Sequence, residues 1–156
     1  MNDPVYFPNQ DTILRFTIPG RPIVQKNNLN IYMRKIGNKR IPFIDHNKKM
    51  KDRRDEISHL IFKEYHNLGY TSPIYYPIEI NFDFYITRVS EPDLDNLPSI
   101  VLDAMQGLKA KGGLKVAVTL EDDKLYKKGC VHKIVQGDIA YHGEPRTEVE
   151  VRRYRG

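Results

Sequence analysis

The sequence predicts a single α/β (α+β) domain, residues 1–156, in which a mixed β-sheet packs against two main α-helices. The chain has the length of one ordinary domain, and 40% of its residues are hydrophobic, which is enough to form a core. Apolar residues recur at a two-residue period in some segments and at a helical period in two others. Strands and helices that alternate along one chain predict helices packed on a mixed sheet.

The first third of the chain is expected to hold one strand and a long irregular segment. Residues 1–10 contain two prolines and should form a loose lead-in. Every second residue from Leu14 to Ile18 is apolar, which predicts a half-buried strand that ends at Pro19-Gly20. Residues 21–46 lack a sustained period, so we expect a basic loop or irregular hairpin there. The side chains expected to pin it to the body are Tyr32, Ile36, Ile41 and Phe43.

The middle of the chain predicts a helix and then the clearest strand. From Ile57 onward apolar residues follow helical spacing, which predicts a helix from about Asn47 to Asn67. Asp45 or Asn47 is expected to cap its start, and Gly69 follows its end. Residues 78–87 then alternate between apolar and polar without a break.

The second half predicts one more helix and two more strands. Apolar residues from Leu97 to Leu108 keep helical spacing, so a helix should begin near Asn96, with Pro98 in its first turn. Residues 109–115 are rich in lysine and glycine and are expected to form a flexible insertion. Apolar residues in 131–135 and alternation in 147–154 predict the last two strands. The only cysteine, Cys130, is expected in the core, and alone it can form neither an internal disulfide nor a thiolate zinc site.

Charged residues are unevenly distributed along a chain of net charge +5. The stretch from Arg21 to Arg54 holds eleven basic and two acidic residues, a net charge of +9, whereas Glu91 to Asp123 holds seven acidic residues and three lysines. A basic region beside an acidic cluster fits a protein that binds a polyanion and positions metal ions on it. A solvated charged surface without a binding role is the alternative interpretation.

An acidic motif lies where the strand of residues 78–87 leads into the second helix. Asp93 and Asp95 are two residues apart, so in an extended chain both carboxylates project to the same side. Aspartate and asparagine before a helix are also common N-caps, so capping is the alternative interpretation of this motif.

Further polar residues extend this acidic region. Asn96 and Asp103 add an amide and a carboxylate along the helix, and Asp122 and Asp123 form a second acidic pair. Carboxylate oxygens suit Mg²⁺, which activates water and stabilises the charge that develops when a phosphodiester is cut. Sequence spacing cannot show whether the second pair lies near the first.

Several other classes of function find no support in the sequence. It contains no glycine-rich phosphate loop or dinucleotide fingerprint, so we expect no nucleotide cofactor. The five histidines lack a zinc-binding spacing, and no pattern marks a nucleophilic serine. No apolar stretch is long enough to cross a bilayer and no signal peptide is evident, so we expect a cytoplasmic protein without membrane contact.

The acidic region resembles the motifs of the RusA family of Holliday junction resolvases, found in bacteria and their prophages. The family pattern is an Asp-Leu-Asp-Asn motif, a helix with Asp-Ala-Leu, and an Asp-Asp pair before a strand. Here it reads Asp93-Leu94-Asp95-Asn96-Leu97, then Asp103-Ala104-Met105, then Asp122-Asp123. The N-terminal half is similar in kind, with Ile18-Pro19-Gly20-Arg21-Pro22 ending a strand before a basic loop that bears Asn27 and Asn28.

The resemblance implies a RusA-like fold and a homodimeric, Mg²⁺-dependent endodeoxyribonuclease, with Mn²⁺ as an alternative ion. Such an enzyme resolves four-way DNA junctions in recombination and repair by paired symmetric hydrolysis of phosphodiesters. Two identical sites of a two-fold dimer suit two opposed strands. The resemblance makes Asp93, Asp95 and Asp123 the catalytic, metal-binding carboxylates, Asp122 a further metal ligand, and Asn96 and Asp103 supporting residues. The basic residues expected to contact DNA are Lys26, Arg34, Lys35, Lys39, Arg40, Lys48 and Lys49.

The chain departs from the family pattern at two places. Family members often carry a lysine six residues after the first motif aspartate, where this chain has Ser99. Lys109, Lys111 or Lys124 could replace it, and the insertion of residues 109–115 lengthens the path to Asp122. These departures keep two alternatives open: a catalytically inactive branched-DNA-binding protein of a phage recombination system, and a nuclease acting on flaps or other branched DNA.

Overall fold

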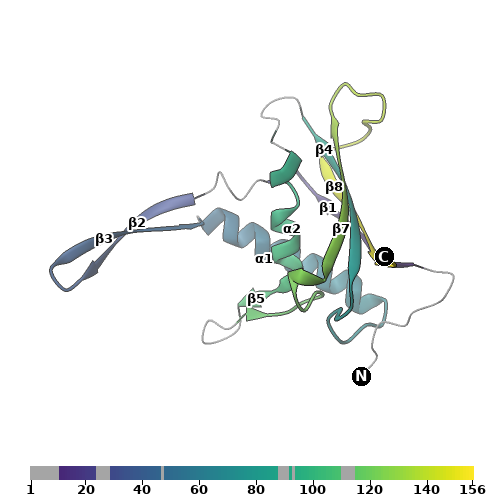
Figure 1. Cartoon of the computed structure of the whole chain (residues 1–156). Coiled ribbons are helices and arrows are strands. Elements are labelled where there is room, and N and C mark those ends of the chain that lie inside the picture. The colour runs from purple at the N-terminus through teal and green to yellow at the C-terminus, as the bar shows by residue number, and fades with distance from the viewer. Residues whose placement is uncertain (1–10, 24–28, 47, 88–91, 93, 110–114) are drawn as a thin grey trace.

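The protein folds as a mixed four-stranded β-sheet with two helices packed on one face (Figure 1), which confirms the predicted fold class. The computed structural model describes residues 11–23, 29–46, 48–87, 92, 94–109 and 115–156. Of residues 29–32, 43–46, 95, 108–109 and 115–116 only the backbone is described.

The elements follow one another in the order that alternation of strands and helices predicts, with short 3-10 helices labelled η. Their bounds are β1 Thr12–Pro19, β2 Leu29–Ile36, β3 Lys39–His46, α1 Lys48–Asn67, β4 Ile78–Ile86, η2 Leu94–Asn96, α2 Ser99–Gln106, β5 Leu108–Lys109, β6 Lys115–Val116, η3 Asp123–Leu125, β7 Tyr126–Val135 and β8 Arg146–Arg153.

The sheet has the strand order β1-β8-β4-β7. The last strand of the chain, β8, lies between β1 and β4 and is antiparallel to both. Val149 of β8 therefore lies opposite Phe16 on one side and Phe82 on the other. Strand β7 forms one edge and runs parallel to β4. Strands far apart in sequence thus build one continuous sheet.

The core lies between the sheet and the two helices. Alternation along β1 and β4 turns their apolar residues inward, and Phe82 is completely buried. Helix α1 adds Ile57, Ile61 and Tyr65 to this core, at the helical spacing seen in the sequence. The Ser58 hydroxyl on the same helix donates a hydrogen bond of 2.7 Å to the carbonyl oxygen of Ala104, which joins α1 to α2.

Helix α2 begins later than predicted, so the expected start near Asn96 is wrong. Residues 94–96 form the 3-10 helix η2, and α2 proper begins at Ser99. Proline disfavours the helical conformation in the residue before it, and Pro98 therefore separates the two helices. The two ends of the insertion pair with each other, since β5 and β6 form a small antiparallel ladder. Its centre, residues 110–114, lies outside the described residues.

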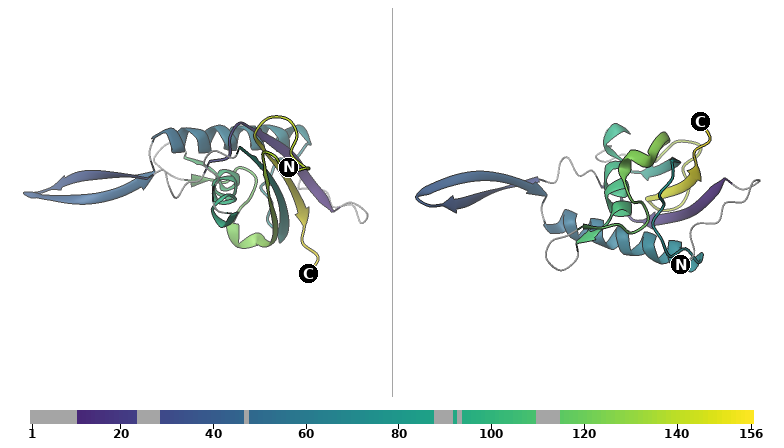
Figure 2. Two further views of the ribbon diagram at one scale, coloured as in Figure 1. Left: turned by 90° about the horizontal axis from the view of Figure 1, so that it is seen from above. Right: turned by 60° about the horizontal axis from the view of Figure 1, so that its bottom comes forward.

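Residues 29–46 form a regular β-hairpin, where the sequence had indicated a loop or irregular hairpin. Strands β2 and β3 pair in register and join through a two-residue turn at Gly37-Asn38, with Gly37 at a φ of 61°. The hairpin projects away from the rest of the molecule (Figures 1 and 2). Ile36 and Ile41 are 60% and 44% exposed, so the expectation that they pin this segment to the body is wrong. They lie towards the tip of the hairpin, away from the core.

The predicted burial of Cys130 is also wrong. Cys130 is exposed because strand alternation places it on the open face of the sheet, opposite Asn81. Its neighbour Val131 lies opposite Phe82 and packs against the core. Among the described residues, no helix is long and apolar enough to cross a membrane.

Candidate metal and DNA-binding site

The acidic motif lies beside the edge strand β7. The 3-10 helix η2, which contains the backbone of Asp95, packs against β7. The Nζ of Lys133 on that strand donates a hydrogen bond of 3.3 Å to the carbonyl oxygen of Pro92. Asp93 and the side chain of Asp95 lie outside the described residues, so their role as metal ligands stays a prediction.

Two contacts hold the turn that follows the motif. Leu97 is completely buried in the core, and the Ser99 hydroxyl donates a hydrogen bond of 3.2 Å to the carbonyl oxygen of Asn96. The N-cap residue of α2 is Pro98, and no described side chain caps the helix. The sequence analysis gave N-capping as the alternative role of the motif residues. No motif residue occupies the N-cap position of α2.

The second acidic pair lies at the start of β7. Asp122 is the N-cap of η3, and its Oδ1 accepts a hydrogen bond of 2.9 Å from the backbone N–H of Lys124. This hydrogen bond lowers the pKa of Asp122 from its ordinary value. Asp122 and Asp123 are both exposed, so a carboxylate that caps the turn is also open to a ligand from solvent.

The two acidic regions lie at opposite ends of α2 in this structure. Because β7 runs parallel to β4, Tyr126 lies beside Ile78 and Val135 beside Ile86. The Asp122-Asp123 pair comes just before Tyr126, whereas Pro92 is held near the other end of β7 by Lys133. Figure 1 shows η2 above α2 and η3 below it. The fold described here does not bring the second pair to the motif.

Asp103 lies between these two ends. It sits on α2, is half-buried, and its carbonyl oxygen accepts a hydrogen bond from the backbone N–H of Gly107. Among the side chains that the structure describes, no three histidine, cysteine or acidic residues form a group that could hold a metal ion.

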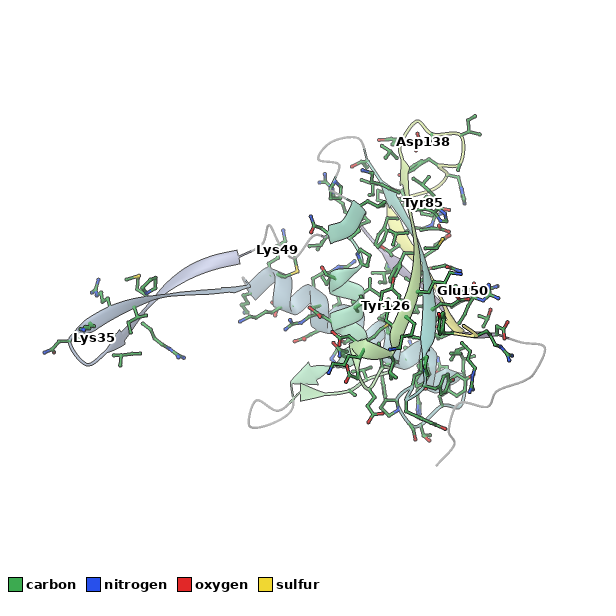
Figure 3. All side chains as sticks on the ribbon, in the orientation of Figure 1. Lys35, Lys49, Tyr85, Tyr126, Asp138 and Glu150 are labelled. Carbon is green, nitrogen blue, oxygen red and sulfur yellow. The ribbon has the colours of Figure 1, made fainter. Side chains whose placement is uncertain are left out.

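The predicted DNA-contacting residues fall into two groups in space. Arg34, Lys35, Lys39 and Arg40 are exposed on the β2–β3 hairpin. Lys48 and Lys49 are exposed where α1 begins, and Lys26 lies outside the described residues. Figure 3 shows Lys35 near the far end of the hairpin and Lys49 at its base.

Lys133 is the residue that the sequence analysis missed. Of the lysines considered as replacements at Ser99, Lys124 lies in η3, at the far end of α2, and Lys111 and the side chain of Lys109 are outside the described residues. Lys133 instead reaches the motif segment itself. The sequence did carry a signal, because Val131, Lys133 and Val135 occupy alternate positions, and a lysine on the apolar side of a strand is unusual.

A second polar group lies on the open face of the sheet and was not predicted. Nδ1 of His132 lies 3.0 Å from Oδ1 of Asp83, and Nε of Arg15 donates a 2.8 Å hydrogen bond to Glu150. These residues line an open hollow of about 770 Å³ together with further acidic residues, Glu64 and Glu148. The lining of this hollow contains four acidic residues and one arginine.

Burial alone would raise the pKa of Glu150, but hydrogen bonds and the charge of Arg15 outweigh it. The net effect lowers the pKa of Glu150 from its ordinary value of 4.5. Thr12 and Asn81 also donate hydrogen bonds to its carboxylate, so this one side chain links β1, β4 and β8.

Comparison with models of known protein families and with curated proteins gives no match to this chain.

Proposed function

We propose that this protein is a Mg²⁺-dependent endodeoxyribonuclease that acts as a homodimer and cuts branched DNA, with the four-way junction as its substrate. The observation that supports this most is the hydrogen bond from Lys133 to Pro92. It fixes a segment flanked in sequence by Glu91 and Asp93 against the edge of the sheet, beside the amino group of Lys133. The resemblance of residues 93–123 to the RusA motifs adds the substrate class.

In this proposal the chain's own residues hold the substrate and orient the motif. The exposed cations of the hairpin and of the start of α1 bind phosphates, a contribution that weakens as salt increases. Lys133 acts as a positioning residue, because its bond to Pro92 fixes the backbone between the acidic residues. A Mg²⁺ ion held by Asp93 and Asp95 would activate water and stabilise the charge of the transition state.

The contribution of Asp123 needs its own test. In the described fold Asp123 lies at the other end of α2 from η2, so it shares a metal centre with Asp95 only if DNA binding or a second subunit brings the two together. Cleavage by the Asp123→Asn variant therefore tests whether Asp123 takes part in the metal centre, whereas cleavage by the Asp95→Asn variant tests the centre itself.

The deciding experiment is a cleavage assay on an immobile four-way junction, a flap and a linear duplex, with Mg²⁺, Mn²⁺ or EDTA. We expect paired symmetric nicks in the junction that require the metal ion. Asp95→Asn should abolish cleavage and retain junction binding, because it removes a ligand and a negative charge that faces phosphates. Asp52→Asn, an exposed position on α1, is the matched control. Full cleavage by Asp95→Asn would refute the proposal, and preferred cutting of flaps would change its substrate.

A branched-DNA-binding protein without catalysis is the second candidate. The distance between the two acidic regions along α2 favours it, since a nuclease centre needs converging carboxylates. It predicts tight, salt-sensitive junction binding and no nick at any metal concentration. Sedimentation equilibrium with and without the junction tests the homodimer for either candidate.

A further inference from the structure

The hairpin β2–β3, here called the ribbon, exposes both faces of its outer part, residues 33–42. Every residue from Met33 to Pro42 is exposed, and the ribbon extends from the body in both views of Figure 2. A two-stranded hairpin that packs on nothing is only marginally stable in water. Its composition should therefore reflect a partner that it meets outside its own chain.

The strand register divides the outer part of this ribbon, residues 33–42, into two faces of matching composition. Residues directly opposite each other share a face, and neighbours along a strand lie on opposite faces. Lys35 pairs with Arg40, and Ile36 pairs with Lys39. The first face carries Met33, Lys35, Arg40 and Pro42, and the second face carries Arg34, Ile36, Lys39 and Ile41. Each face thus combines two cations with two apolar residues.

The outer part of the ribbon brings like charges together on the first face. Like charges directly opposite on paired strands are destabilising, and Lys35 faces Arg40. The sequence contains no acidic residue between Ile31 and Ile44. An ordinary surface hairpin has one face on the core and one in solvent, whereas this one is cationic on both. A single anionic surface would contact the exposed cations of only one face.

We propose that the ribbon lies between two duplex arms of branched DNA, with one face against the backbone of each arm. This rests on the proposed substrate, although not on catalysis. Four residues per strand, Met33–Ile36 and Lys39–Pro42, carry these exposed side chains over about 13 Å, which spans several phosphates spaced about 3.4 Å apart along one strand. A branch point is where two backbones converge, so a two-faced cationic ribbon distinguishes branched from linear DNA.

The test compares the two faces by fluorescence anisotropy, in EDTA so that nothing is cut. The variants are Lys35→Ala/Arg40→Ala for the first face, Arg34→Ala/Lys39→Ala for the second, and all four together. Lys63→Ala/Lys128→Ala removes two exposed cations from the body and is the matched control. The probes are a synthetic four-way junction and a linear duplex of equal length, titrated at several salt concentrations. Thermal melting checks that each variant is folded.

Each single-face variant should bind the junction at least about tenfold more weakly, and the slope of log K against log salt should fall by about two. On the linear duplex either face can serve, so each single-face variant should lose only about twofold, and the fourfold variant should lose far more. The control should match the wild type on both probes.

Three results would overturn the proposal. Junction binding unaffected by one of the two single-face variants would mean a one-sided ribbon. Equal losses on junction and duplex would mean that the ribbon does not sense the branch. Wild-type binding by the fourfold variant, with a change in its sedimentation mass, would make a second copy of the chain the partner. No cleavage is measured, so the binding result is the same whether or not the Asp95 site is catalytically active. If the protein cuts junctions but the ribbon variants bind them like the wild type, only this inference is refuted and the proposed function stands.

Discussion

Lys133 holds the segment that precedes the acidic motif against the sheet. Lys133 is partly buried on the helix side of β7, and burying an ammonium group without acceptors is costly. Its bond to the Pro92 carbonyl oxygen supplies one acceptor and fixes the chain beside Asp93. The alternation of side chains along β7 therefore places Lys133 on the helix side of the strand, where the Pro92 carbonyl oxygen accepts its hydrogen bond.

We predict that Lys133→Met impairs metal-dependent cleavage more than folding. Loss of the anchor should raise the Mg²⁺ concentration needed for half-maximal cleavage by about tenfold or more, the usual cost of removing a group that orients metal ligands. Junction binding in EDTA should change little. Metal titrations of the cleavage rate measure this, with Lys128→Met as the exposed control on the same strand and Lys133→Arg as the conservative variant. An unchanged metal dependence would show that Lys133 serves only the fold.

At the scale of elements, α2 depends on neighbours to satisfy its last carbonyl groups. The last four carbonyl groups of a helix lack partners within it. The Ser58 hydroxyl of α1 donates a hydrogen bond to the carbonyl oxygen of Ala104. The backbone N–H groups of Thr119 and Leu120 donate hydrogen bonds to the carbonyl oxygen of Met105. The short helix is thereby bonded at its C-terminal end to α1 and to the segment before η3.

Ser58→Ala should lower the free energy of unfolding by about 1–3 kcal/mol, because the Ala104 carbonyl oxygen then stays buried without that hydrogen bond. Urea unfolding of the wild type and the variant gives the difference. His59→Ala, at the exposed neighbouring position, should change it by no more than about 0.5 kcal/mol. Equal effects of the two changes would contradict this role of the hydroxyl.

The elements with a sustained period were predictable from the sequence. Alternation located β4 and the central part of β1, and helical spacing located α1, because each of these buries one face against a single core. The ribbon was predicted only as a loop or irregular hairpin, because a strand pair with two exposed faces has no apolar period that the sequence could reveal. The start of α2 was misplaced because the apolar spacing already begins at Leu97 and does not reflect the backbone restriction that Pro98 imposes on that residue.

The candidate site was predictable in residue type and not in arrangement. The sequence analysis identified Asp122 and Asp123 as a second acidic pair of candidate metal ligands, and the structure shows that both are exposed. It could not show that parallel pairing of β7 with β4 separates this pair from η2, because strand direction in a sheet depends on contacts distant in sequence. Lys133 was missed for the same reason, since its partner lies 41 residues away along the chain.

At the scale of the whole molecule, Glu150 couples sheet stability to pH. Its pKa is lowered in the folded state, so its contribution is present above its unfolded value near 4.5 and is lost as the pH falls through the folded value. Glu150→Gln should lower the free energy of unfolding by about 1 kcal/mol at pH 7 and by close to nothing at pH 2. Urea unfolding at the two pH values measures this, and Glu144→Gln, an exposed position, is the control. A difference that persists at pH 2 would contradict an electrostatic origin.

The central position of β8 has a consequence for how the protein is made. On a ribosome, β1 and β4 emerge long before the strand that separates them in the finished sheet, and among the described strands they do not pair with each other. Both therefore wait with open hydrogen-bonding edges until residue 153 has left the exit tunnel. A nascent chain arrested before that point keeps these two edges unpaired, so we expect it to associate through them with other chains unless a chaperone binds it.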